Sequence, residues 1–268
     1  MVGFHKEGTV ETGPLVKVRN FLVAIALPVI LIALWQYAST NGIVRPTLFP
    51  APTTLAGTFV DLVSSGILLE SLAVSFRRVI TGFLIGTLAG LVVGFVVGLF
   101  PLADRALSVF TSVLRPIPVI ALIPVFIVIF GIGETTNVAV ITVGSFWSTM
   151  LNTTSGIREC DDKLLELAYA YRISSVRTVF QIILPAAVAS IITGVRLGLG
   201  MAWMGVVAAE MIGASSGVGY MIMYARELAQ TDRLYVYVLL IGVIGLVLDR
   251  ILLVVQNKLT RKFKGQAD

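Results

Sequence analysis

The chain has very few of the residues from which enzymes and metalloproteins build their sites. It contains one cysteine, Cys160, and one histidine, His5, among 268 residues. A single cysteine excludes a disulfide within the chain, and one cysteine with one histidine supplies too few ligands for a zinc site of the Cys/His type. The acidic neighbours of Cys160 also disfavour the thiolate that a nucleophilic cysteine needs. We therefore expect no catalytic residue and no metal site in this chain.

Charge is the second shortage. Only 13% of the residues are charged, whereas soluble domains carry about a quarter. Hydrophobic residues make up 57% of the chain, and the mean hydropathy is +0.95. Several apolar runs approach or exceed the ~18 residues needed to cross a bilayer. The composition therefore predicts an all-α integral membrane protein, whose net charge of +5 comes from residues that flank the spans rather than from a nucleic-acid surface.

Six apolar segments of roughly spanning length follow one another along the chain. We place these spans at about 21–38, 74–100, 107–131, 137–156, 179–212 and 234–255. They predict a six-transmembrane-helix bundle over residues 21–257, with a cytoplasmic tail at 1–20 and a basic tail at 258–268. The loop at 158–178, between the fourth and fifth spans, is polar and patterned as a helix.

The first span follows a positively charged tail, as the apolar core of a signal peptide does. Its apolar core is longer than the ~7–15 residues usual in signal peptides. The bulky WQY before Ala38 offers no cleavage site of the small-x-small type. We expect a retained signal anchor, with a cleaved signal peptide as the alternative.

The distribution of lysine and arginine orients the predicted bundle. With both termini inside, twelve of these residues fall in cytoplasmic segments, five fall in outer segments, and three lie within or at the edges of spans. This excess agrees with the positive-inside rule. Both termini and the loop at 158–178 are therefore predicted to be cytoplasmic.

Glycine recurs at every fourth position of the second span. The stripe comprises Gly82, Gly86, Gly90, Gly94 and Gly98. Four residues turn an α-helix by about 400°, so the stripe drifts by about 40° per step and a neighbouring helix must cross at an angle. Because glycine has no side chain, the two backbones can approach closely. The stripe predicts a helix-packing seam rather than a ligand site.

Prolines interrupt the third span. Arg115-Pro116-Ile117-Pro118 lies in its first half, and Pro124 follows. Proline removes a backbone donor and kinks a helix. Within a membrane such kinks are tolerated where a neighbour or a water-filled cavity satisfies the freed carbonyls.

A polar, helix-patterned segment, Glu166 to Pro185, separates two long apolar spans. Its first part, Glu166 to Ser175, predicts a helix too short to be stable alone. Such a helix must pack into a groove, either in its own bundle or in a partner. The pattern alone fits both a docking element and an ordinary connector.

The same residues carry a family resemblance. Glu166, Ala168 and Ile182-x-Leu184-Pro185 stand at the offsets of the signature cytoplasmic loop of permease subunits in binding-protein-dependent ABC importers, which this segment resembles. The sequence departs from that signature at Leu167, where alanine is usual, and at Arg172, where glycine normally provides a turn.

Motifs elsewhere resemble one branch of that family, the aliphatic sulfonate, taurine and nitrate type. The resemblance covers residues 30–260 approximately, and its motifs are LFPAPTTL at 48–55, SFRRVITGFLIG at 75–86, LRPIPVIALIPVFIVIFGIGE at 114–134, GVRLGLGMAWMGVVAAEM at 194–211 and GVGYMI at 217–222.

The resemblance implies the fold of type I importer permeases and a division of labour among subunits. It implies a second copy of the permease, most simply as a homodimer, an external solute-binding protein, and ATPase subunits that bind ATP and Mg. The chain itself lacks the phosphate-binding motif G-x-x-x-x-G-K-[ST], so ATP hydrolysis is expected in a separate subunit. The implied location is a bacterial cytoplasmic (inner) membrane, among lipids and without nucleic acid. The implied ATPase-coupling residues are Glu166, Leu167, Ala168, Tyr169, Ala170, Tyr171, Arg172, Ile173 and Ser174.

Ionisable residues within spans are costly and suggest a transport path. The candidate path residues are Arg115, Pro116, Pro118, Arg196, Trp203 and Glu210. Arginines facing a water-filled path would attract an anion such as a sulfonate or nitrate. Alternatively, the arginines pair within the bundle with Glu210, Asp249 or backbone carbonyls. Other solutes, such as a vitamin precursor, and a stand-alone secondary transporter remain alternatives for the function.

Overall fold

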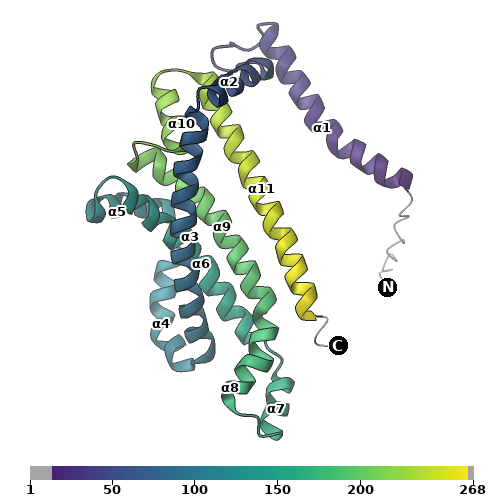
Figure 1. Ribbon diagram of the computed structural model, residues 1–268, viewed down its shortest axis with the longest axis vertical. Coiled ribbons are helices and arrows are strands. Elements are labelled where there is room, and N and C mark those ends of the chain that lie inside the picture. Colours follow the sequence, from purple (N-terminus) through teal and green to yellow (C-terminus); the bar gives the residue numbers. More distant parts are fainter. Residues whose placement is uncertain (1–13, 265–268) are drawn as a thin grey trace, which may run out of the picture.

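The computed structural model describes residues 14–264, and the regular structure in that range is entirely helical (Figure 1). Most of the long helices form the bundle, and the shorter ones lie at its two ends and along one side (Figure 1). The elements are α1 (Pro14–Thr40), α2 (Pro52–Ser64), α3 (Ile67–Leu99), α4 (Pro101–Leu114), the 3₁₀ helix η1 (Val119–Leu122), α5 (Ile123–Phe130), α6 (Glu134–Arg158), α7 (Asp162–Ala170), α8 (Ser175–Thr178), the π-helix η2 (Val179–Ile183), α9 (Leu184–Gly213), α10 (Val218–Glu227) and α11 (Thr231–Lys264).

The glycine stripe of α3 lies directly against α6. The five glycines meet, in order, Ile141, Ser145, Thr149, Thr153 and Ile157 of α6. A Cβ added to Gly90 would lie 2.8 Å from the carbonyl oxygen of Phe146 and 2.9 Å from Cβ of Thr149. Both helices therefore use a four-residue repeat at this contact, with glycine on one side and a side chain on the other.

A second close contact joins α6 to α9. A Cβ on Gly194 would lie 2.6 Å from Cβ of Asn152, and one on Gly198 would lie 3.1 Å from Oγ1 of Thr149. Helix α6 is thus packed between two glycine-bearing helices. Its buried polar side chains are Thr136, Asn137, Ser145, Thr149 and Thr153. Small polar residues at such contacts are typical of helices that associate within a membrane.

Three helical segments in the described range are long and apolar enough to cross a membrane. They are Ile67–Leu99, Ser175–Gly213 and Thr231–Lys258. Helix α6 does not pass the same test, because its polar residues lower its hydropathy, and α1 contributes a shorter apolar stretch, Ile25–Thr40. The six-span count therefore stays a prediction.

The predicted third span is not one straight crossing. Pro101–Leu114 and Val119–Phe130 pass the hydropathy test only as a pair, and they are bent by 87° at the break between them. The break contains Pro116 and Pro118, neither of which can donate a backbone hydrogen bond. The residues between the second and third predicted spans, 101–106, are helical rather than a loop, since α4 begins at Pro101.

Both tails are partly helical. Helix α1 begins at Pro14 and so includes residues 14–20 of the predicted N-terminal tail, and α11 extends through Lys264, beyond the predicted end of the sixth span near residue 255. The second span likewise begins earlier than expected, at Ile67. The remaining parts of the predicted tails, 1–13 with His5 and 265–268, lie outside the described residues.

Four of the short helices lie at the two opposite ends of the bundle. Helices α2 and α10 lie at the upper end in Figure 1, and α7 and α8 lie at the lower end. The upper end is held by an apolar cluster made of Leu55, Leu62, Leu68, Val218, Ile222, Val236 and Tyr237. Helix α1 leans away from the bundle and meets it near its C-terminal end, where Trp35 stacks at an angle on Tyr235 of α11.

The glycine contact predicts a position-specific cost. Gly90→Ala places a methyl group against the backbone of α6 and should lower the free energy of unfolding by about 1–3 kcal/mol. Gly200→Ala in α9 is the matched control, because nothing lies within 4 Å of the added Cβ. Thermal unfolding of the purified protein in detergent measures both. Equal stability of the two variants would contradict close packing at Gly90.

Candidate functional site

Helix α7 is bounded by two local capping structures. At its start, the side chain of Asp161 accepts a hydrogen bond of 3.0 Å from the backbone N–H of Lys163. At its end, the N–H of Ile173 donates to the carbonyl of Ala168 at 2.9 Å, and the N–H of Arg172 donates to Tyr169 at 3.0 Å. This pair of bonds is the Schellman motif, which satisfies the last carbonyls of a helix.

Arg172 adopts the left-handed conformation, with φ of 49°. The turn that the resemblance assigns to a glycine therefore forms in this chain with an arginine in its place. The chain reverses here, and Ser175–Gly213 then continues as one long helical segment. Pro185 lies in the first turn of α9, directly after the π-helix η2, where its missing N–H is accommodated.

The nine predicted coupling residues form an exposed surface at one end of the molecule. Ala168 is buried, and the other eight are exposed. The exposed fractions of Tyr169 and Tyr171 are 88% and 78%. Beside them, a groove of about 500 Å³ separates α7 and α8 from the end of α3, where Leu99 and Phe100 line it. Helix α7 therefore stands away from its own bundle along most of its surface.

Cys160 lies just before α7, and its side chain is buried. Burial raises the pKa of the Cys160 thiol, and the carboxylates of Asp161 and Asp162 raise it further. The residue therefore stays a neutral thiol near pH 7, in agreement with the expectation from its acidic neighbours.

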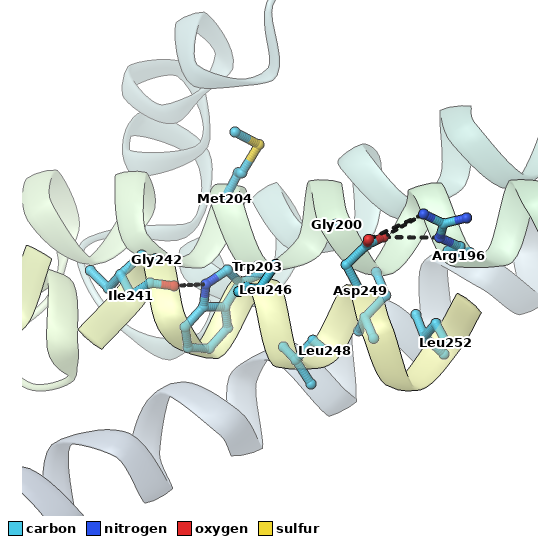
Figure 2. Close-up of a pocket in the computed structure, with 12 residues that line it drawn as sticks. Arg196, Gly200, Trp203, Met204, Ile241, Gly242, Leu246, Leu248, Asp249 and Leu252 are labelled. Atoms are coloured by element: carbon cyan, nitrogen blue, oxygen red, sulfur yellow. Dashed lines mark hydrogen bonds and ion pairs between the residues drawn. The ribbon is translucent and has the colours of Figure 1, made fainter. Parts of the chain in front are cut away.

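The structure does not bring the six candidate path residues together. Arg115, Pro116 and Pro118 are exposed at the break between α4 and η1. Arg196 and Trp203 line a cavity of about 310 Å³ between α9 and α11 (Figure 2). Glu210 is separate from both, in a buried polar cluster that involves α3.

Arg196 makes a two-bond ion pair across the α9–α11 cavity. Its Nε donates to Oδ1 of Asp249 at 2.9 Å, and its Nη2 donates to Oδ2 at 3.1 Å (Figure 2). Nη1 donates to Oε1 of Gln256 at 3.2 Å. Trp203 donates to the carbonyl oxygen of Ile241 at 3.1 Å. Arg196 was predicted either to face a transport path or to pair within the bundle. In the structure it pairs with Asp249, so its charge is largely neutralised.

A buried ion-pair cluster, centred on Arg78 and Glu210, joins α3 to α9. The side chain of Arg78 is 3% exposed and that of Glu210 is fully buried. Nη1 of Arg78 donates to Oε1 of Glu210 at 2.8 Å. Glu210 also accepts hydrogen bonds from Oγ of Ser75 at 2.8 Å and from the N–H of Gly219 at 2.9 Å. A buried charge is tolerated only with such partners.

The cluster reaches α6 and the loop before α10 through the remaining donors of Arg78. Its Nε and Nη2 bind the carboxylate of Glu134, the first residue of α6. Its other donors bind the carbonyl oxygen of Ser216 at 2.7 Å and Oγ of Ser216 at 3.1 Å. All five N–H groups of Arg78 are therefore used. Three distant parts of the chain, around residues 78, 134 and 210–216, therefore meet at this one guanidinium.

The sequence contained only a weak signal for this cluster. Arg77 and Arg78 are adjacent near the start of the second predicted span, yet the side chain of Arg78 is 3% exposed and that of Arg77 is 68% exposed. Glu210 was considered as a path residue or as a partner for the span arginines Arg115 and Arg196. An alternation of buried and exposed faces along the first turns of α3 could have separated the two arginines. The pairing across 132 positions required the tertiary structure.

The buried pair predicts different effects for two adjacent arginines. Arg78→Gln leaves Glu210 buried without its counter-charge and should lower the free energy of unfolding by about 3–5 kcal/mol. Arg77→Gln, the matched control, removes an exposed partner 3.5 Å from Glu134 and should change it by less than about 1 kcal/mol. Thermal unfolding measures both. Similar losses in the two variants would contradict the role assigned to Arg78.

The chain is similar to three transport permeases along most of its length. It is 36% identical to an aliphatic sulfonates transport permease protein, SsuC, of Bacillus subtilis (strain 168), covering 91% of this chain and 89% of the relative. It is 30% identical to the taurine transport system permease protein TauC of Escherichia coli (strain K12), covering 90% of each. It is 28% identical to the nitrate import permease protein NrtB of Synechococcus elongatus, covering 88% of each.

The fold is also similar to a known permease structure. A chain of the MetNI methionine ABC transporter, in an inward-facing form, superposes with a TM-score of 0.60 at 19% identity, covering 74% of this chain and 96% of that one. The family model for the binding-protein-dependent transport system inner membrane component matches residues 82–264. The resemblance inferred from the motifs is confirmed: the chain belongs to this family of inner membrane components, and it is a transport permease subunit rather than an enzyme.

Proposed function

We propose that this chain forms the translocation path of an ATP-driven importer for a small anionic solute, delivered by an external binding protein. The names of the similar permeases, which refer to aliphatic sulfonates, taurine and nitrate, support an anion of this size and charge. Separate ATPase subunits would bind ATP and Mg. Substrate choice among these anions would rest mainly with the binding protein.

The observation that carries the proposal is the exposed surface of α7 and its C-terminal turn. Tyr169, Tyr171 and Leu167 expose large apolar side chains at the end of the molecule opposite α2 and α10. Aromatic residues on a short protruding helix are typical of a contact surface with another protein. The positive-inside count assigns this end to the cytoplasm, where an ATPase subunit would dock. Closure of the ATPase subunits would move α7, which continues through one tight turn into the helix ending at Gly213.

A second copy of the chain would complete the path. No residue of α4 is buried, and Leu102, Val109 and Phe110 of α4 expose 80%, 73% and 58% of their surface. Val128 of α5 exposes 87%. This bent pair of helices lies along one side of the α3–α6–α9 core, so it is a suitable face for a homodimer whose path runs between the two copies.

The carboxylates of Glu210 and Asp249, which lie in membrane-spanning helices, can be used to test the alternative of a stand-alone secondary transporter. Such transporters place ionisable residues at the membrane midplane, where they bind the coupling ions. Glu210 is paired with Arg78, and Asp249 is paired with Arg196. Both carboxylates thus serve to join helices, which favours the importer. A related importer carrying a vitamin precursor would share all these features and differ only in its solute.

Arg115 is the candidate that would attract an anion. It is exposed at the proline break and makes no ion pair within residues 14–264. Arg115→Gln should raise the KM for uptake of a labelled sulfonate by roughly fivefold, because one attractive charge is lost. Arg105→Gln in α4 is the control and should leave KM unchanged. An unchanged KM in Arg115→Gln would remove Arg115 from the path.

Dependence on an ATPase distinguishes the importer from the stand-alone transporter. Cells that express the chain with its binding protein and ATPase subunit should take up labelled taurine or another sulfonate. Replacing the ATPase with a variant that cannot hydrolyse ATP should reduce uptake to background. Uptake that survives without a working ATPase would refute the importer.

A further inference from the structure

Two residues other than glycine have positive φ within the described range, Arg172 and Ala229, with φ of 49° and 54°. Both end a helix with the same pair of hydrogen bonds. After α10, Ala229 N–H donates to Arg226 at 3.1 Å and Gln230 N–H donates to Ala225 at 2.8 Å, in the pattern seen after α7. The two sites are therefore equivalent in backbone geometry. Glycine would occupy either position with less strain.

The two sites differ in charge and in place. Ala229 has no charge and lies at the upper end of the bundle in Figure 1, beyond α10. Arg172 follows α7 at the lower end. Its guanidinium is exposed and makes no hydrogen bond or ion pair with any residue that the structure describes. Only the backbone hydrogen bonds that close the turn therefore offset the strain at Arg172, and its side chain contributes no hydrogen bond or ion pair within the described residues.

The surface around Arg172 has the chemistry of a binding site for an acidic protein surface. The exposed coupling residue Glu166 lies more than one helical turn before Arg172, and from Leu167 to Thr178 the chain carries two arginines, Arg172 and Arg177, and no carboxylate. The side chains of Tyr169 and Tyr171 flank the turn and are almost fully exposed. Tyrosine and arginine are enriched among the residues that dominate the affinity of protein interfaces. A guanidinium among exposed tyrosines can pair with a carboxylate through two parallel hydrogen bonds.

We propose that Arg172 is a partner-recognition residue, which binds a carboxylate on the ATPase subunit when α7 docks. The inference rests on the proposed function, since it assumes that α7 meets an ATPase. The left-handed turn places the guanidinium at the exposed end of the docking element, and the ion pair offsets the strain once the complex forms. Strained residues of this kind persist where the surrounding contacts or the function require them.

If Arg172 recognises the ATPase subunit, replacing it with glycine should stabilise the chain but weaken docking. If the arginine is merely tolerated at this turn, the replacement should only stabilise the chain. Arg172→Gly and Ala229→Gly should each raise the Tm of the purified full-length chain by a few degrees, because both relieve the same backbone strain. Arg172→Gly should also weaken binding of the ATPase subunit that co-purifies with the unaltered chain, by at least about tenfold, since a charged hydrogen-bonding partner is lost. Ala229→Gly should leave binding unchanged.

Two further variants separate charge from backbone shape. Arg172→Asn keeps a residue that tolerates the left-handed conformation but removes the charge, and it should bind the ATPase subunit as weakly as Arg172→Gly. Arg172→Lys keeps the charge and should restore part of the affinity. Raising the salt concentration should weaken binding of the unaltered chain more than that of Arg172→Gly.

The outcomes separate this inference from the proposed function. If the unaltered chain binds an ATPase subunit and Arg172→Gly binds it with equal affinity and equal salt dependence, the recognition role of Arg172 is refuted and the importer stands. If the unaltered chain binds no ATPase subunit and its uptake needs none, the proposed function fails, and the inference fails with it.

Discussion

The close backbone contact of α6 with α3 and α9 is the constraint on which the rest of the structure depends. Glycines on both neighbouring helices remove the side chains that would hold the backbones apart, so Thr149 of α6 can touch Gly90 on one side and Gly198 on the other. In a membrane, apolar side chains gain little from contact with another helix, because lipid tails are equally apolar. Close packing and the polar contacts that it allows therefore supply much of the stability. A polar α6 is acceptable because its polar residues are largely enclosed by these two helices.

The buried ion-pair cluster fixes the register in which α3 packs against α6. The glycine contact between α3 and α6 repeats every four residues, so packing alone would tolerate a shift of one step. Arg78 distinguishes the steps, because Glu134, Glu210 and Ser216 meet its donors in only one register. The interaction of one guanidinium with α6, α9 and the loop before α10 makes this end of the core a single unit. In the proposed homodimer, movement during transport would then take place between the two copies rather than within this core.

The proposed docking element, helix α7 with its C-terminal turn, is built on a different principle from the core. Its shape depends on local hydrogen bonds, with Asp161 at one end and the turn at Arg172 at the other, and only Ala168 of the coupling residues is buried. Few contacts hold α7 against α3, and a groove remains between them. A surface so weakly used by its own chain is available to a partner. In the proposed role of Arg172, an ion pair with that partner offsets the backbone strain of the turn.

The sequence by itself determined the class of protein, the family, the glycine seam and the location of the polar segment that contains α7. Each of these depends on composition, on a short repeat or on a motif within a few residues, all of which are local. It also located the proline break, although not its 87° bend, because the direction of a bend depends on what the two halves pack against. Only the tertiary structure decided which charges pair, since Arg78 with Glu210 and Arg196 with Asp249 join residues 132 and 53 positions apart. It likewise decided that Arg172 adopts the left-handed turn, because the bonds closing the end of α7 favour that conformation over the residue's own preference.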